Sequence, residues 1–291
     1  MSTPRLPPNY CRTLPGKTPA RDLSDPEPTL TVRVSWNANG MAPEQRYVEW
    51  PAKCSPRSSI ACLWASRPAE TSAGRVLPDA CIDIIWDGAS IFVAGPDTGP
   101  VPIIPRPGQF FAGLRFLPGR APAFLGVPAS ELLDSRVPLA DLWGRASADR
   151  LANQLASAAS PEAAASVLDH EVAARAGTAR AADPLIDELV AMYTTTQPDA
   201  ASAVRFASRA MSVGERRLHR HCRAAVGYGP KMLERVLRFQ RARRIARGTT
   251  SLALVAAMAG YADQAHLTRE SHRLAGTTPS DLFKTSRLSG S

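Results

Sequence analysis

The chain has 291 residues, of which 44% are hydrophobic and 21% charged, and its formal net charge is +9. This length is sufficient for two domains. No apolar run approaches the roughly 18 residues of a membrane helix, and no apolar segment follows the first charges, so we predict neither a membrane span nor a secretory signal. Five scattered cysteines favour reduced thiols and a cytoplasmic protein.

The charge is distributed unevenly. Residues 200–291 contain 17 basic and 5 acidic residues, a net charge of +12. The first 199 residues hold the remaining 18 of the 35 basic and 21 of the 26 acidic residues, a net charge of −3. A surface that binds a polyanion is therefore expected only in the C-terminal third.

The first 44 residues are rich in proline, serine and threonine, and they contain few large apolar residues. Such a segment cannot bury enough apolar surface to offset the entropy of ordering, so we predict a disordered leader for residues 1–44. Its segment 30–36, LTVRVSW, alternates like a short strand, so an arm that docks elsewhere is the alternative.

Residues 45–193 are expected to form a folded domain of their own. Short apolar runs separated by Gly, Pro and Asp turn signals predict a small antiparallel sheet or barrel. The predicted strands cover residues 59–65, 76–77, 82–86, 90–94 and 109–116. The predicted helices cover residues 121–125, 129–133, 139–144, 147–155, 161–176 and 184–193.

Two of these helices carry apolar stripes. Their apolar positions could form a dimer interface or pack back on the sheet, and the pattern alone does not decide between the two. The residues are Leu151, Leu155, Val167 and Leu168. Residues 194–199 contain threonine and proline between two helical regions, so we predict a linker there.

Four aspartates, with Cys81 among them, cluster in the predicted sheet region. They could bind a metal or a cationic effector, but aspartates beside turns more often cap and close loops. The aspartates are Asp79, Asp83, Asp87 and Asp97. The chain has no CxxC, HExxH, GxSxG or P-loop motif, so we predict no catalytic residue, metal or cofactor, and no enzyme.

A repeat marks the C-terminal third. The segments LHRHCRAAVGYGP (218–230) and LTRESHRLAGTTP (267–279) agree at four positions in one register, each pair 49 residues apart. The pairs are Leu218 with Leu267, Arg220 with Arg269, Gly227 with Gly276, and Pro230 with Pro279. This agreement predicts two copies of one supersecondary unit.

Each copy is predicted to be a helix-turn-helix unit. A short apolar helix and a Gly-containing turn precede a helix with one apolar face and one face of Arg, Gln and His, which suits the major groove of DNA. The inward residues are Leu218, Cys222 and Ala225 in the first copy, and Leu267, Ser271 and Leu274 in the second. A basic helix at 231–247, roughly 25 Å long, separates the copies. An ordinary helical bundle with a solvated basic face is the alternative.

Residues 200–286 resemble the DNA-binding domain of the AraC/XylS family of bacterial transcription regulators. GYADQAHLTRESHRLAGTTPSDL is similar to the C-terminal signature of that family, and SVGERRLHRHCRAAVGYGPKMLERVLRFQRAR to its first unit and linker helix. The family usually has an aromatic residue where this chain has Cys222 and Ser271, which predicts looser packing on the inward faces.

VLPDACIDIIWDG, VAGPDTGP and FAGLRFLPGRAPAFLGVPASEL, within residues 58–144, resemble an N-terminal domain of unassigned function in a subgroup of the family. The resemblance implies a multidomain α+β protein, with a small antiparallel sheet or barrel and helices before an all-α double helix-turn-helix domain at 200–291. It also implies that residues 45–193 sense a small molecule or dimerise. The protein would then be a regulator that binds double-stranded DNA, with a small-molecule effector, RNA polymerase and a second copy as candidate partners, and no membrane.

The resemblance further implies which residues meet DNA. The candidates for reading bases are Arg216, His219, Arg220, Gln264, Ala265, His266 and Arg269. The candidates for phosphate contacts or solvated charge are Arg217, Arg223, Arg238, Arg241 and Arg273.

Two rival functions also involve DNA. A DNA alkylation-repair methyltransferase of the Ada type would need closely grouped cysteines with zinc-ligand spacing, and Cys54, Cys62 and Cys81 are too sparse. A non-specific architectural protein would bind DNA without sequence preference.

Overall fold

The computed structural model describes residues 46–67, 74–106, 108–179, 181–195, 203–249 and 251–288. The predicted leader at 1–44, with its strand at 30–36, lies outside the described residues, as does most of the predicted linker at 194–199. Among the helices that the structure describes, none is long and apolar enough to cross a membrane.

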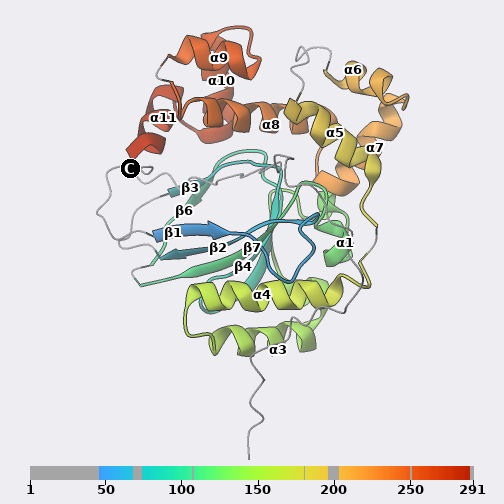
Figure 1. Cartoon of the computed structure of the whole chain (residues 1–291), viewed down its shortest axis with the longest axis vertical. Helices are drawn as coiled ribbons and strands as arrows, with labels where there is room; N and C mark the ends of the chain where they lie inside the picture. Colours follow the sequence, from blue (N-terminus) through green and yellow to red (C-terminus); the bar gives the residue numbers. More distant parts are fainter. Residues whose placement is uncertain are drawn as a thin grey trace, which may run out of the picture. The chain divides into compact units, whose positions relative to one another are not determined.

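The N-terminal region contains the predicted antiparallel sheet (Figure 1). Six strands pair in the order β1-β2-β7-β4-β5-β8, and β3 pairs separately with β6. The strands are β1 (Arg46–Trp50), β2 (Ile60–Arg67), β3 (Gly74–Val76), β4 (Ile82–Trp86), β5 (Ile91–Ala94), β6 (Val101–Ile103), β7 (Phe111–Phe116) and β8 (Arg136–Pro138). Strands β1, β6 and β8 were not predicted; β6 and β8 have three residues each, which are too few to establish an alternating pattern.

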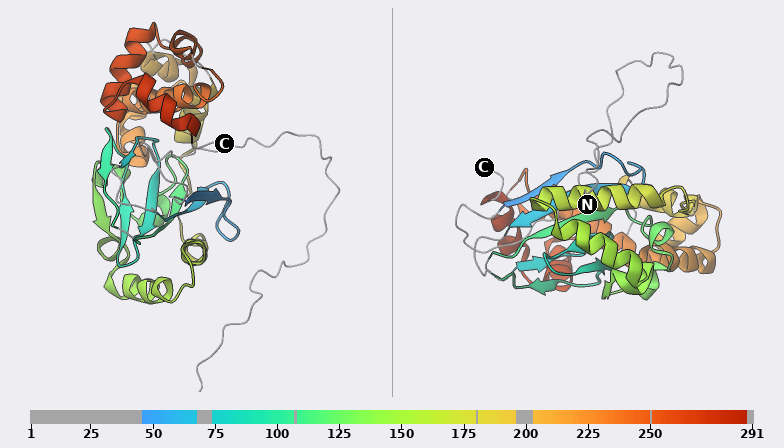
Figure 2. Two further views of the ribbon diagram at one scale, coloured as in Figure 1. Left: turned by 90° about the vertical axis from the view of Figure 1, so that its left-hand side faces the viewer. Right: turned by 90° about the horizontal axis from the view of Figure 1, so that it is seen from below.

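One face of the sheet is covered by helices. The alternation of a strand directs Ile82, Ile84 and Trp86 of β4 toward this face. Helix α4 (Pro161–Arg175) packs on β2 and β7, and α3 (Arg145–Ala156) packs on α4, as Figure 2 shows. The stripe residues Leu151, Leu155 and Leu168 are buried in this core, and Val167 packs against it. The stripes therefore pack into the core beneath the sheet, which is the second of the two predicted alternatives.

Short elements connect the sheet to these helices. They are α1 (Pro122–Leu125), the 3-10 helix η1 (Ala129–Glu131) and α2 (Leu139–Trp143). Ser160 begins α4 as its N-cap, because its side-chain oxygen accepts a hydrogen bond from the backbone N–H of Ala163.

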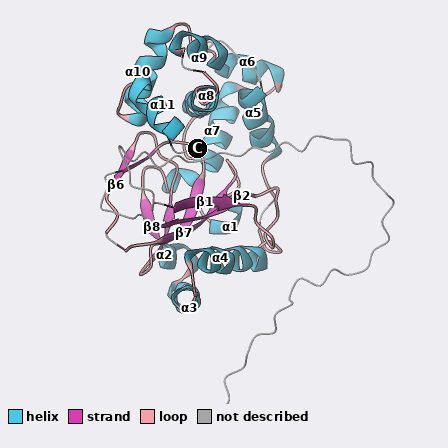
Figure 3. Cartoon of the chain, turned by 60° about the vertical axis from the view of Figure 1, so that its left-hand side comes forward, coloured by secondary structure: helices cyan, strands magenta, loops and turns pink. Residues whose placement is uncertain are grey.

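The C-terminal region is helical (Figure 3). Its helices are α5 (Pro184–Thr195), α6 (Ala203–Ala210), α7 (Glu215–Val226), α8 (Pro230–Ile245), α9 (Leu252–Ala259), α10 (Gln264–Ala275) and α11 (Pro279–Leu288). The 49-residue repeat corresponds to two helix pairs, α6–α7 and α9–α10, with α8 between them. Gly227 and Gly276 end α7 and α10 in the left-handed conformation, with φ of +88° and +66°.

Helix α5 shares the core of these helices. Its residues Ile186, Leu189 and Tyr193 are buried in the same cluster as Leu218 and Val236, and Asp183 at its start lies 2.6 Å from Nδ1 of His221. The region built around the repeat thus begins with Pro184, one helix before the predicted linker.

Candidate DNA interface and a buried cavity

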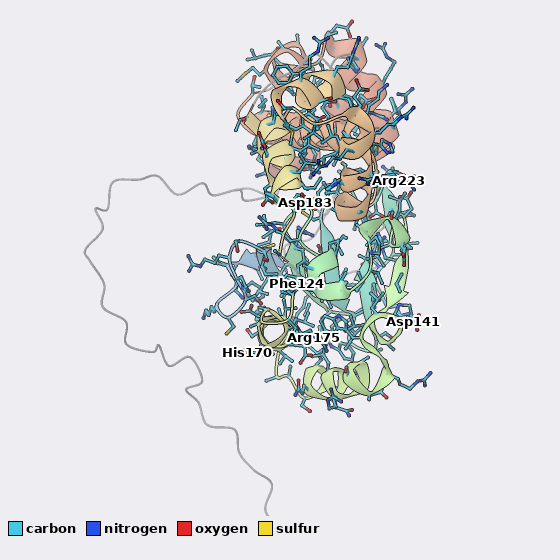
Figure 4. All side chains as sticks on the ribbon, turned by 90° about the vertical axis from the view of Figure 1, so that its right-hand side faces the viewer. Phe124, Asp141, His170, Arg175, Asp183 and Arg223 are labelled. Atoms are coloured by element: carbon cyan, nitrogen blue, oxygen red, sulfur yellow. The ribbon has the colours of Figure 1, made fainter. Side chains whose placement is uncertain are left out.

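Helix α7 exposes a basic face opposite its buried side. Leu218 and Cys222 are fully buried, whereas Arg216, His219 and Arg220 are exposed and lie together at positions i, i+3 and i+4. Arg217 is also exposed on this helix. Arg223, which Figure 4 labels, is exposed as well. The structure therefore groups all five side chains predicted on this helix at its surface.

Helix α10 has the corresponding arrangement. Gln264, Ala265 and Arg269 are exposed on it, and so is Arg273. Leu267, Ser271 and Leu274 are fully buried, and Ser271 donates a hydrogen bond to the carbonyl of Thr277 at 3.0 Å. The polar residue that replaces the family's usual aromatic thus has a partner inside the core.

His266 is the exception among the residues predicted to read bases. It is half-buried, and its ring meets that of Tyr261 edge-on, with centroids 5.1 Å apart. Burial, together with the charge of Arg238, lowers the pKa of His266. The ring is therefore neutral at pH 7 and offers one donor and one acceptor. Asp263 fixes the start of α10 by accepting a hydrogen bond from the backbone N–H of His266 at 2.6 Å.

Two arginines predicted to contact phosphate or to be solvated have structural roles instead. Arg238 is only 3% exposed: it pairs with Glu234 at 3.1 Å and lies over the ring of Tyr261 at 4.9 Å. Arg241 is half-buried and donates to the carbonyls of Tyr193 and Ala259. The prediction was wrong for both, because the faces of α8 that carry them are covered by α5, α9 and Tyr261.

Two basic residues of α8 that were not predicted as DNA contacts lie beside α10. Lys231 and Arg235 line a recess of about 280 Å³ together with His266 and Arg273 of α10. Arg235 holds Glu270 through two hydrogen bonds of 2.8 and 3.1 Å. The lining carries four Lys or Arg side chains against two glutamates, so this recess attracts anions. A basic helix without internal Gly or Pro was visible in the sequence, but which of its side chains would lie beside α10 was not.

The face of the sheet that α4 does not cover borders a cavity of about 350 Å³. Its walls come from β2, β4, β5 and β7 on one side and from β3, β6 and the segment 77–81 on the other. Apolar side chains dominate the lining: Trp64, Val76, Leu77, Ile85, Phe92, Val101, Ile103, Ile104 and Phe111. This size and apolar character are typical of a small-molecule pocket.

Two ion pairs lie beside the apolar walls, and the first of them is buried. Arg115, which is 4% exposed, donates from Nε and Nη2 to the two carboxylate oxygens of Asp83 at 3.0 and 2.8 Å. Burial raises the pKa of Asp83, and the guanidinium of Arg115 opposes this rise. Arg136 holds Asp97 in the same two-bonded manner at 2.9 and 2.8 Å. Asp79 also lines the cavity, 3.6 Å from Nε of Arg115.

Three of the four clustered aspartates thus meet at this cavity, and Cys81 lies with them. Asp87 does not: it closes a turn by accepting hydrogen bonds from the backbone N–H groups of Ala89 and Ser90. Within the described part of the chain, no three His, Cys, Asp or Glu residues are placed to hold a metal ion.

The described cysteines do not form a group. Cys62 and Cys81 are buried, and burial raises the pKa of the Cys62 thiol to about 12. Cys54 lies apart from them, with its sulfur 3.5 Å from Nε2 of His170 (Figure 4). This arrangement lends no support to the alkylation-repair alternative, because an alkyl-accepting cysteine must be available as a thiolate.

Two known domain families match parts of the chain. A family described as "Helix-turn-helix domain" matches residues 207–285, and a "Domain of unknown function (DUF6597)" matches residues 57–138. The chain thus carries an AraC-type helix-turn-helix domain in its C-terminal third, and this domain supports a DNA-binding transcription regulator. The resemblance of the C-terminal motif is confirmed, and so is the multidomain α+β fold. The first match contains α7 and α10, and the second contains every charged residue of the cavity.

Solved structures with a similar backbone arrangement include ToxT from Vibrio cholerae O395. That structure has a TM-score of 0.42 and 10% sequence identity, and the match covers 79% of this chain and 97% of ToxT. ToxT bound to (E)-4-(8-methylnaphthalen-1-yl)but-3-enoic acid gives 0.41 and 11%, over 77% and 97% of the two chains. Similarity of this extent says nothing about what this chain binds. No curated protein matches the chain significantly.

Proposed function

We propose that this regulator binds a specific DNA site through two helix-turn-helix units, α6–α7 and α9–α10, whose second helices enter successive major grooves. It acts in the cytoplasm and catalyses no reaction. One observation carries the proposal: at equivalent positions of the repeat, both recognition helices, α7 and α10, bury a leucine and expose an arginine. The helix between them, α8, has 16 residues and is roughly 24 Å long, which suits units about one turn of DNA apart.

Selection of sites from random double-stranded DNA with the full chain tests this proposal. We expect an asymmetric motif of two parts about one helical turn apart. Tight binding without enrichment of any motif would support the architectural alternative. A motif with one part only would show that a single unit reads DNA.

Binding is expected to weaken steeply with salt, because arginine–phosphate contacts release counterions at about 0.9 per phosphate. Lys231→Ala should weaken binding to all sequences alike and reduce the slope of log K against log salt by about 1. Affinity measured at several salt concentrations gives both slopes. Lys53→Ala, which removes an exposed lysine of the N-terminal region, is the matched control. Equal slopes for the two variants would exclude a phosphate contact by Lys231.

We also propose that a small-molecule effector binds the 350 Å³ cavity and thereby changes DNA affinity. The support is that one segment both borders the cavity and packs against the C-terminal helices. Leu77 and Ala80, from the segment that borders the cavity, are buried in the core of the C-terminal helices, and Gln240 of α8 donates a hydrogen bond to the carbonyl of Pro78. A ligand that favours one position of this segment shifts DNA affinity by its preference for that position. A second copy and RNA polymerase are further partners expected of such a regulator.

The charge of the cavity predicts the class of effector. Its lining has three carboxylates but two guanidiniums, and Asp83 and Asp97 already occupy both of these through paired hydrogen bonds. Both guanidiniums are thus already neutralised and the lining carries a net negative charge, so we expect a neutral or cationic ligand rather than an organic anion. Phenethylamine, phenylacetamide and phenylacetate share one apolar frame and differ in charge. In thermal unfolding of the full chain, we expect the amine or the amide to raise Tm and the acid to leave it unchanged.

Asp79→Asn is the control for this comparison, because asparagine keeps an acceptor for the backbone N–H of Cys81 but removes the charge. The variant should lose any preference for the amine over the amide. Stabilisation by phenylacetate alone would contradict the assignment of ligand class.

A further inference from the structure

We infer that the loop at residues 95–100, GPDTGP, fixes the separation of the two recognition helices and so determines which spacing of the two half-sites the protein accepts. This inference rests on the proposed binding by two units. Pro96 and Pro100 are its positioning residues, and Gly227 and Gly276 are their partners.

The contacts lie at equivalent points of the repeat. Gly227 ends α7 and Gly276 ends α10. A Cβ atom added at Gly227 would lie 2.5 Å from Cγ of Pro96, and one added at Gly276 would lie 3.3 Å from Cγ of Pro100. Both proline rings are therefore packed directly on the backbone that ends a recognition helix. Four residues of extended chain span at most about 14 Å, so the two helix ends are held within a short, defined distance.

The loop is itself held firmly. The backbone N–H of Gly95 donates to the carbonyl of Ser135 at 3.0 Å, and the carbonyl of Pro96 accepts from the N–H of Asp134 at 3.1 Å. The backbone N–H and the hydroxyl of Thr98 donate to the two carboxylate oxygens of Asp134 at 2.6 and 2.8 Å. Since proline also fixes its own φ, the loop behaves as a rigid bracket with two contact points.

The same loop borders the cavity. Gly95 and Asp97 line it, whereas Pro96 and Pro100 face the helix ends. The ion pair of Asp97 with Arg136 is the link between the two sides, because it anchors the loop from within the cavity wall. A ligand that displaces Asp97 would thus move both recognition helices through one element, and the range of accepted half-site spacings would change with it.

Affinity for DNA sites of altered spacing tests the inference. The selected site is varied by inserting or removing one base pair between its two parts. We expect such a change to weaken binding of the unchanged chain roughly tenfold or more, as single defects in a site commonly do. The double variant Pro96→Ala and Pro100→Ala should bind the best site less tightly and tolerate the altered spacings better. Pro51→Ala, at an exposed proline of the sheet region, should keep the original profile. An unchanged spacing profile in the double variant would overturn the inference.

A second measurement does not depend on DNA. Spin labels at Ala224 of α7 and His272 of α10, both exposed, report the separation of the helix ends in a full chain whose Cys11 and Cys54 are replaced by serine. We expect a narrow distance distribution that widens in the double variant and stays narrow with Pro51→Ala. Equal widths would reject the bracket even if the protein binds DNA as proposed. Widening in a chain that binds no two-part site would instead retain the bracket and reject the proposed function.

Discussion

Arg115→Met is expected to lower the free energy of unfolding by about 3–5 kcal/mol, the largest loss of stability that we predict. Arg115 is 4% exposed, and its two hydrogen bonds to Asp83 neutralise a carboxylate that is itself only 7% exposed. Methionine fills much of the same space but leaves that carboxylate buried and unpaired. Urea unfolding followed by tryptophan fluorescence measures the loss, and Trp64 is a local reporter because its Nε1 donates to Asp83 at 3.0 Å.

The pH dependence of this loss has a defined sign. Burial raises the pKa of Asp83, so the folded variant binds a proton more readily than its unfolded chain. The variant therefore becomes more stable as pH falls, and its loss of unfolding free energy relative to the unchanged chain should shrink below neutral pH.

Adding Asp83→Leu to Arg115→Met should restore most of the stability at neutral pH, because a well-packed apolar pair can replace a buried ion pair. Arg75→Met, at an exposed arginine of β3, should change stability by less than about 0.5 kcal/mol. A similar small effect for Arg115→Met would show that water reaches Asp83.

The features that were predicted correctly from the sequence are those that depend on the short periods of helices and strands. The period of 3.6 residues identified Leu218, Cys222, Leu267 and Leu274 as inward positions, and all four are fully buried. Alternation with a period of two residues predicted the bounds of β4 as they are found. Capping depends on equally local chemistry: Ser251 and Asp263 accept hydrogen bonds from the backbone N–H groups of Leu254 and His266, as serine and aspartate commonly do at N-caps.

The features that the sequence did not reveal depend on contacts between distant segments. Arg238 and Arg241 occupy polar positions on a basic helix, and nothing in the local pattern indicates that Tyr261 and α5 cover them. The cavity also joins residues far apart in the chain: Asp97 and Arg136 are separated by 39 positions. The aspartate cluster pointed to the correct region, but a metal, a cationic effector and turn closure all remained compatible with it.

The double variant Arg216→Ala and Arg269→Ala is expected to lose about 2–6 kcal/mol of binding free energy at the best DNA site. Each arginine is exposed on a different recognition helix, and one base-reading arginine typically contributes about 1–3 kcal/mol. The two residues share no partner, so their effects should add. Competition binding against the selected site and against single-base variants of it measures both affinity and preference.

The control must remove the same charge elsewhere. Arg145→Ala with Arg150→Ala takes two exposed arginines from α3 and lowers the net charge equally, so it should leave the preference among sites unchanged. If Arg216 and Arg269 read bases, their loss weakens the best site far more than random DNA, and the preference relaxes in a different half of the site for each residue. Equal weakening on all sequences would make them phosphate contacts, and the specificity would then have to come from the other exposed side chains of α7 and α10.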